Sequence, residues 1–403
     1  MDKPLKTVYV FGAGYSCYAN FPVQSDILPR IYKLDKGIVG NSVDYITSVY
    51  GKEFIPSLED VYTLLDRAIS RRDNFGGKSF NELDEIRTSL TKAILYVINS
   101  CSDEFFRNKK ITLGIDKKLN KEKIYDFKSN NFYKTNAAFF LKKRIESKLD
   151  SDTFSIISLN WDTLFEDSLY ELKPSIKKKH KFDIDYCCYT YPLTDSSHTS
   201  SLTQKSRKIF NIKLLKLHSS ANWLICPNCN RLFTGLGSKK NFWSLYIDAV
   251  DCPKCSAISK KFLRIDKSPV LFPFLISPTF LKDIDNNTHI NMVWHNAFVE
   301  LVEADKIVFI GYSLPDSDYM IRTLLKRSIK KNTSIEVVLK EYDNYSKTTS
   351  KYLRNFFAAE RYKHFFPESL YKLKFHYNGV EGYFSKIHGK RNFKNLITQI
   401  NDL

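Results

Sequence analysis

The sequence predicts an α/β fold built on a Rossmann-like, doubly wound parallel sheet. Short, continuously apolar segments recur along the chain, most of them precede a segment with helical spacing, and glycines follow two of them. Strands that are buried on both faces of a parallel sheet have this continuous apolar pattern, with helices as the connections. With 403 residues, 43% of them hydrophobic, the chain is long enough for two or three packed regions.

Six apolar segments are the predicted strands. They are Thr7–Phe11, Phe154–Leu159, Asn211–Leu217, Phe274–Ser277, Lys306–Gly311 and Ser334–Lys340. A helical insertion is expected between the first two, over residues 27–150, because segments such as "SLEDVYTLLDRAI" have amphipathic spacing, with Ser57 as the N-cap. Residues 345–403 are rich in aromatic side chains and predict a mostly helical C-terminal tail, which is a candidate assembly or partner surface.

Four cysteines form the most specific local pattern of the chain. They are Cys226, Cys229, Cys252 and Cys255. Two Cys-x-x-Cys knuckles favour a tetrahedral zinc site with four thiolates, and a pair of redox dithiols is the alternative. Because four thiolates close the coordination sphere, the metal is expected to be structural, within a ribbon module over residues 222–262.

Glycines after two predicted strands indicate places where a phosphate can approach the backbone. Gly12–Gly14 follows the first strand and opens a helix, a position where amide groups and the helix N-terminus favour negative charge. A tight turn is the alternative, since Cys17 stands where a dinucleotide-binding fingerprint has its third glycine. Gly311 and Ser313 follow a later strand, where glycine permits close approach and serine can bond a phosphate or a ribose.

Polar side chains follow two other strands. Asn160 and Asp162 come just after the second predicted strand, and His218 follows the third. Ligands of open α/β sheets bind at the carboxyl edge, where a neutral amide can bond a ribose hydroxyl or a carboxamide. A helix cap at Asn160 and an ordinary packed histidine at His218 are the alternatives. A site of four cysteines is complete without His218, so this histidine is not expected to bind the metal.

Charge and hydropathy bear on location and partners. The formal net charge is +18, which admits an anionic partner such as nucleic acid or a nucleotide. The lysine runs are scattered, however, and this favours charge spread over solvated faces. No window approaches the roughly 20 apolar residues of a membrane span, and the first residues lack a signal-peptide layout. A cytoplasmic protein without membrane association is therefore expected.

In their order, these motifs resemble the sirtuin (silent information regulator two) family. Gly-Ala-Gly-x-Ser is followed by Asn-x-Asp after a strand, by Leu-His beside the cysteines, and by Gly-x-Ser after a later strand. The segments "SLNWDTLFED", "KLHSSANW" and "IGYSLPDSD" are most similar to the bacterial sirtuin-like branch rather than to the histone deacylases. The resemblance runs in pieces from about Val8 to Leu339, and implies a sirtuin-like NAD-binding catalytic domain over residues 1–344.

The resemblance also implies a role for each matching position. The positions that match the residues around the diphosphate and the adenosine half of NAD are Gly12, Ala13, Gly14, Ser16, Gly311 and Ser313. Asn160 and Asp162 match the asparagine and aspartate that face nicotinamide and its ribose, and His218 matches the catalytic histidine. The four cysteines match the structural zinc module.

Three positions depart from the family pattern. Asn20 stands where many members have glycine, and Ser219 replaces the glycine that usually follows the histidine. Leu159 replaces the glutamine that deacylases carry before the asparagine, which weakens the deacylase interpretation. Ser219 puts the binding of an acyl-lysine in question.

The resemblance implies an NAD hydrolase (NAD glycohydrolase) that cleaves the nicotinamide–ribose bond and depletes cellular NAD in antiphage defence by abortive infection. Such a toxic activity implies control by a homo-oligomer or by a separate partner chain. Similar proteins are paired with HerA-type ATPases or short Argonaute systems, or sense phage proteins, and indirect involvement of nucleic acid stays open. The alternatives are an NAD-dependent protein deacylase or ADP-ribosyltransferase, and a non-enzymatic nucleotide-sensing or nucleic-acid-binding zinc module.

Overall fold

The structure is a computed structural model of the whole chain. It describes residues 5–107, 128–147, 153–193, 209–235, 250–258, 269–279, 287–340, 350–389 and 393–403. Within these residues, no helix is long and apolar enough to cross a membrane.

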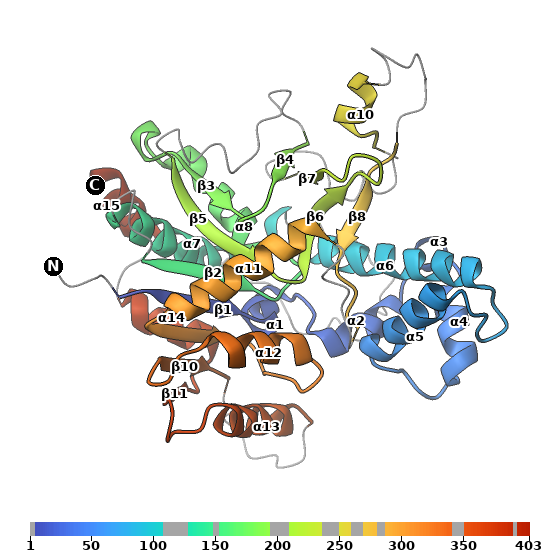
Figure 1. Ribbon diagram of the computed structural model, residues 1–403. Helices are drawn as coiled ribbons and strands as arrows, with labels where there is room; N and C mark the ends of the chain where they lie inside the picture. The colour runs from blue at the N-terminus through green and yellow to red at the C-terminus, as the bar shows by residue number, and fades with distance from the viewer. Residues whose placement is uncertain are drawn as a thin grey trace.

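A wholly parallel sheet forms the centre of the molecule, with seven strands in the described part of the chain (Figure 1). In spatial order the strands are β11 (Lys372–His376), β10 (Ser334–Val338), β9 (Lys306–Ile310), β1 (Thr7–Phe11), β2 (Phe154–Ser158), β5 (Phe210–Lys216) and β3 (Phe182–Asp185). The chain extends the sheet in both directions from β1, which is the doubly wound arrangement. The predicted fold class is therefore confirmed.

Helices cover both faces of this sheet, which explains the continuous apolar pattern of its strands. Every residue of β1 is buried. Tyr9 and Phe11 point to one face because strand side chains alternate, and both contact Phe140 of α7 (Lys128–Glu146). In Figure 1, α11 (Thr288–Glu303) crosses the sheet from the opposite side.

The segment between β1 and β2 is built mainly from helices in its described part, as predicted. Its helices are α1 (Ala13–Ser16), α2 (Gln24–Ile31), α3 (Lys36–Val39), α4 (Ser42–Tyr50), α5 (Leu58–Arg71), α6 (Phe80–Arg107) and α7. The predicted N-cap of α5 is confirmed, because Ser57 Oγ accepts a hydrogen bond of 3.0 Å from the Asp60 N–H. Figure 1 shows α2 to α6 to one side of the sheet.

A second, smaller sheet carries the cysteine pairs. Its strands, in spatial order, are β4 (Thr190–Pro192), β7 (Leu232–Thr234), β6 (Ser219–Ile225) and β8 (Phe272–Leu275). The prediction that Phe274–Ser277 belongs to the parallel sheet is wrong in this respect, because β8 pairs antiparallel with β6. A short apolar run is compatible with either sheet, and its strand partner is decided by contacts distant in sequence.

The tail contributes to the main sheet. It contains α13 (Ser350–Phe365), α14 (Gly379–His388) and α15 (Phe393–Asp402), in keeping with the helical prediction, and also strand β11. β11 lies parallel to β10 at one edge of the sheet, and its sequence "KLKFH" alternates lysine with apolar residues. Such alternation is typical of an edge strand with one solvated face. The C-terminal segment is thus part of the fold that builds the site.

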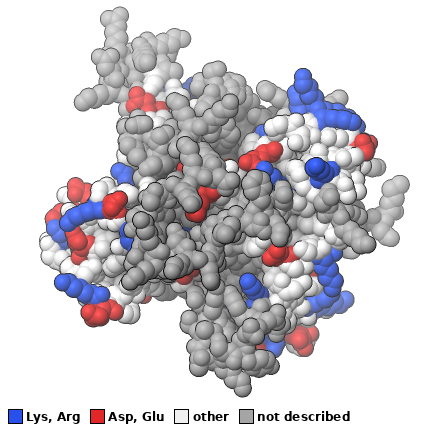
Figure 2. All heavy atoms as spheres, turned by 180° about the vertical axis from the view of Figure 1, so that it is seen from behind, with Lys and Arg blue, Asp and Glu red and all other residues white. Residues whose placement is uncertain are grey.

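The remaining helices connect these strands. They are α8 (Leu164–Tyr170), α10 (Pro253–Ile258) and α12 (Tyr319–Ser328), with short 3-10 helices at Cys17–Ala19, Lys173–Ser175 and Lys178–His180. On the face shown in Figure 2, the described basic side chains lie in several separate groups, and acidic side chains stand beside them. This distribution agrees with the interpretation of the net charge as scattered over solvated surface.

Candidate functional site

A cavity of about 1250 Å³ lies at the carboxyl ends of β1, β2, β5 and β9. The predicted site residues that line it are Gly12, Ala13, Gly14, Asn160, Asp162, His218, Gly311 and Ser313. Ser16 lies directly behind this lining and is 1% exposed. Residues that are far apart in the sequence therefore meet in one place, the edge where open α/β sheets bind ligands.

The two glycine loops pack backbone against backbone. The Gly14 N–H donates to the Gly311 carbonyl at 2.8 Å, and the Gly12 N–H donates to the Ile310 carbonyl at 3.0 Å. A Cβ at Gly14 would lie 2.8 Å from the Gly311 Cα, and a Cβ at Gly12 would lie 2.6 Å from the Tyr312 Cα. Glycine is thus required at both positions by the contact between the loops, and the same small residues leave backbone at the cavity wall.

Asn160 is anchored on the first glycine loop. Its Nδ2 donates to the Gly12 carbonyl at 3.0 Å and to Ser16 Oγ at 3.3 Å, and the residue is 8% exposed. The helix-cap alternative is wrong, because α8 begins at Leu164 and its N–H donates to Asp162 Oδ1 at 3.1 Å. With both amide hydrogens directed to the loop, the amide oxygen of Asn160 is the group suited to meet a ligand.

Asp162 stands beside a buried lysine that the sequence analysis did not single out. Lys216, at the end of β5, donates to the main-chain carbonyl of Asp162 at 2.5 Å and pairs with Glu166 Oε1 at 3.1 Å. Burial raises the pKa of Asp162, while Lys216 and a hydrogen bond from Ser16 oppose this shift. The lysine therefore favours the ionised carboxylate at the cavity wall.

Two further carboxyl groups lie on α8 beneath the site. Burial raises the pKa of Glu166, and Lys216 opposes the shift. Burial also raises the pKa of Asp167 to about 7, although Asp167 Oδ2 accepts a hydrogen bond of 2.6 Å from Thr163 Oγ1. Lys216 thus lies between the main-chain carbonyl of Asp162 and the carboxylate of Glu166, and Glu166 and Asp167 lie outside the lining of the cavity.

His218 lies in the turn between β5 and β6. Its Nδ1 is 3.1 Å from the Leu159 carbonyl oxygen, which can only accept, so Nδ1 carries the proton. Nε2 is then the basic nitrogen of the ring. The turn is itself held, because the Trp294 Nε1–H donates to the Leu217 carbonyl at 3.0 Å. His218 is 9% exposed and lines the cavity, so its ring can meet a group that is bound there.

Two of the three departures from the sirtuin pattern lie at positions with a left-handed backbone. Asn20 and Ser219 replace glycines, and both have left-handed backbones, with φ of 63° and 66°. Ser219 Oγ accepts a hydrogen bond of 2.9 Å from the Ile276 N–H and bonds to the His218 carbonyl. Its hydroxyl thereby joins the histidine turn to the segment after β8. The serine has a structural use at a position whose conformation favours glycine.

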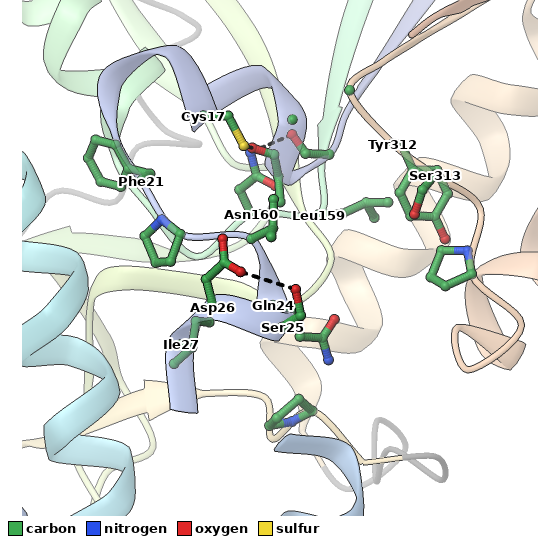
Figure 3. A pocket seen from close by; sticks show the side chains of 18 of the residues that line it. Cys17, Phe21, Gln24, Ser25, Asp26, Ile27, Leu159, Asn160, Tyr312 and Ser313 are labelled. Atoms are coloured by element: carbon green, nitrogen blue, oxygen red, sulfur yellow. Dashed lines mark hydrogen bonds between the residues drawn. The ribbon is translucent and has the colours of Figure 1, made fainter. Parts of the chain in front are cut away.

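Other lining residues were not found from the sequence. The start of α2, the residues before α5 and the start of α14 contribute Gln24–Leu28, Ile55–Glu59 and Asn378–Glu381. Figure 3 shows Asn160 and Leu159 in the middle of the cavity, with Phe21 and Asp26 on one side and Ser313 on the other. These residues carry no recognisable motif, and only the folding of the insertion and the tail brings them to the cavity.

The four cysteines form a separate cluster with the geometry of a zinc site. Their Sγ atoms all lie within 4.8 Å of one another, and the distance is 3.8 Å for Cys226 and Cys255 and 3.7 Å for Cys229 and Cys252. A tetrahedron with zinc–sulfur bonds of about 2.3 Å has sulfur–sulfur edges of about 3.8 Å. The Cys229 N–H points to Cys226 Sγ, and the Cys255 N–H points to Cys252 Sγ, both at 3.5 Å. The cluster thus fits a structural zinc, and His218 lies outside it.

Comparisons with known proteins find only remote similarity. No protein-family model matches the chain, and no curated protein matches it. Among solved structures, a Sir2 homologue–NAD complex is 11% identical and covers 98% of this chain and 90% of its own, with a TM-score of 0.38. A mutant Sir2 homologue in complex with ADP ribose is 12% identical over 98% of this chain and 92% of its own, with a TM-score of 0.37.

Proposed function

We propose that the chain is an NAD hydrolase that cleaves the bond between nicotinamide and ribose. One observation carries this proposal: Asn160, Asp162 and His218 line the same cavity as the two glycine loops. The sequence resemblance assigned these positions separately to NAD and to its cleavage. Their convergence in one cavity supports a common substrate for all of them.

In this mechanism the glycine loops position the two halves of NAD. The diphosphate lies against Gly12–Gly14, and the adenosine half lies toward Ser313 on the neighbouring loop. Asn160 bonds the Gly12 carbonyl, so the amide that orients the ribose is tied directly to the diphosphate loop. Holding both parts of the substrate on connected groups lowers the entropic barrier to the reaction.

The reaction consumes water and releases nicotinamide, ADP-ribose and a proton. As the carbon–nitrogen bond breaks, its electron pair leaves with nicotinamide and positive charge develops on the ribose. Asp162, whose main-chain carbonyl accepts a hydrogen bond from Lys216, faces the nicotinamide carboxamide, and its carboxylate stabilises the developing cation. Water attacks the ribose carbon, and Nε2 of His218 takes a proton from that water or from a ribose hydroxyl.

A transferase is the second candidate, and the volume of the cavity favours it. Sites for small molecules are usually clefts of roughly 300–1,000 Å³, and this cavity of about 1250 Å³ is larger. An acyl-lysine or another acceptor would then enter beside His218, where Leu159, Trp161 and Ile276 give an apolar wall. The absence of the deacylase glutamine at Leu159 favours the hydrolase.

We propose that the hydrolase acts in the cytoplasm and depletes NAD in antiphage defence. The sequence resemblance supports this role, and toxicity requires that the activity be controlled. Control would come from homo-oligomerisation or from a separate chain such as a HerA-type ATPase or a short Argonaute system.

Product identification tests the proposal against the transferase. Purified protein is incubated with NAD, with and without an acetyl-lysine peptide, and nicotinamide, ADP-ribose, its cyclic form and modified peptide are measured. Release of nicotinamide and ADP-ribose that does not depend on peptide supports the hydrolase. Turnover only with peptide supports the transferase, and NAD binding without turnover supports a sensor.

A further inference from the structure

We propose that Arg361, on helix α13 of the tail, is a positioning residue for the loop that receives the adenosine half of NAD. The choice of NAD as the ligand rests on the proposed function. The contacts of Arg361 with the loop come from the structure. Arg361 lies 48 residues after Ser313 in the sequence, yet its guanidinium contacts that residue and lines the same cavity. No sequence motif marks it.

Side chains hold successive carbonyl groups of the loop after β9. Arg361 donates from Nε and Nη2 to the Ser313 carbonyl, at 3.0 and 2.9 Å. The Tyr362 hydroxyl donates to the Tyr312 carbonyl at 3.0 Å, and Arg322 Nη1 donates to the Leu314 carbonyl at 3.3 Å. Residues 312–314 are therefore fixed from outside by α12 and α13.

The loop needs such support because its backbone is unfavourable at Leu314. Leu314 has a φ of 51°, whereas the φ of 66° at Gly311 is one that glycine adopts readily. A left-handed backbone is costly for a branched side chain, and Pro315 further disfavours compact conformations of the residue before it. Strained conformations of this kind persist when surrounding contacts enforce them. The hydrogen bonds to the carbonyl groups of residues 312–314 supply that constraint.

The loop after β9 is in direct contact with Gly12–Gly14, the loop proposed to bind the diphosphate. The Gly311 carbonyl accepts the Gly14 N–H at 2.8 Å, and a Cβ at Gly311 would lie 2.3 Å from the Tyr15 nitrogen. A shift of the loop after β9 would therefore displace the backbone on which the diphosphate rests. The tail helix α13 thus acts on both NAD loops through one set of backbone contacts.

Of the two α13 residues that bond the loop, Arg361 is the one that can be replaced without disturbing the core. Tyr362 is completely buried and packs on Phe309 and Phe366, so its loss would unfold its surroundings. Arg361 is only partly buried and is not part of that aromatic cluster. Lys363, two positions on, is exposed, pairs with Glu360 and does not line the cavity, so it is a matched control on the same helix.

The test compares Arg361→Ala, Arg361→Lys and Lys363→Ala in the full chain by two readouts. Backbone hydrogen exchange of residues 311–318 reports the loop without any ligand. Calorimetric binding of ADP-ribose reports the adenosine and diphosphate subsites without catalysis. We expect Arg361→Ala to speed exchange in this segment and to weaken ADP-ribose binding about tenfold, with KM for NAD raised more than kcat is lowered.

The conservative and control variants separate positioning from charge. Arg361→Lys keeps the charge but offers a point donor in place of a planar fork, so it should recover part of the affinity and not all of it. Lys363→Ala should leave exchange and binding unchanged. All variants should unfold at the same denaturant concentration as the parent within error.

The outcomes distinguish this inference from the proposed function. Unchanged exchange of residues 311–318 in Arg361→Ala overturns the positioning role, whatever happens to NAD turnover. Faster exchange with unchanged ADP-ribose affinity also overturns it, and leaves the hydrolase standing. If the parent protein binds neither ADP-ribose nor NAD, the proposed function fails, and the role of Arg361 toward a nucleotide fails with it.

Discussion

Replacement of Lys216 by methionine tests the buried charge pair beneath the site. The Lys216 and Glu166 side chains are 1% and 2% exposed, and Nζ lies 3.1 Å from the carboxylate. The substitution keeps the apolar stem and leaves the Glu166 carboxylate buried without a cation. Removing one partner of a buried pair costs about 3–5 kcal/mol of the free energy of unfolding.

A double variant separates the pair from its surroundings. Lys216→Met combined with Glu166→Gln removes both charges, so more than half of the lost free energy of unfolding should return. The remainder is the lost hydrogen bond from Nζ to the Asp162 carbonyl. Urea unfolding of the parent, both single variants and the double variant gives the coupling energy directly.

The pH dependence of this variant follows from Glu166. Lys216 lowers the pKa of Glu166 against the raising effect of burial, so its removal lets that pKa rise further. The folded state then binds a proton that the unfolded state releases, and the destabilisation shrinks as pH falls toward the ordinary range of glutamate. A penalty below about 1 kcal/mol, or one that Glu166→Gln does not relieve, would refute the pairing as the cause.

Two further predictions concern the zinc cluster and the acidic helix. The purified chain should contain one zinc per chain, measured by elemental analysis, and Cys252→Ser or a strong chelator should remove it and lower the unfolding temperature. Full stability of the metal-stripped chain would contradict a structural zinc. The raised pKa of Asp167, about 7 against an ordinary 3.8, means that the folded state retains a proton that the unfolded state loses. The free energy of unfolding should therefore fall by up to about 4 kcal/mol as pH rises from about 4 to 7. Asp167→Asn should remove that part of the slope in denaturant titrations, and an unchanged slope would assign it to other groups.

Much of the site was predictable because its residues follow apolar strands. Asn160, Asp162 and His218 each come directly after a buried run, and the carboxyl ends of parallel strands meet at one edge. The cysteine pairs were predictable for a different reason, since metal geometry restricts ligand spacing within each knuckle. In both cases a requirement of the folded structure, a common sheet edge or a metal's geometry, leaves a recognisable pattern in a short segment of sequence.

The rest depended on contacts that no local pattern records. Lys216 ends an apolar strand like any solvated lysine, and only the approach of α8 makes it the partner of Glu166. Strand β11 alternates lysine with apolar residues, a weak signal in a tail with strong helical spacing. Arg361 acquires its role because α13 packs beside the loop after β9. Partners distant in sequence decided each of these features.

The rate of nicotinamide release from NAD should differ sharply between the parent protein and His218→Ala if His218 is the general base. His295→Ala is the matched control, because that histidine is exposed on α11. We expect His218→Ala to lower kcat by roughly 10²–10⁴-fold, as loss of a general base does, and to leave the affinity for ADP-ribose nearly unchanged. His295→Ala should behave as the parent. Equal release by the parent and His218→Ala would contradict the assignment of His218 as the base that drives the cleavage of NAD.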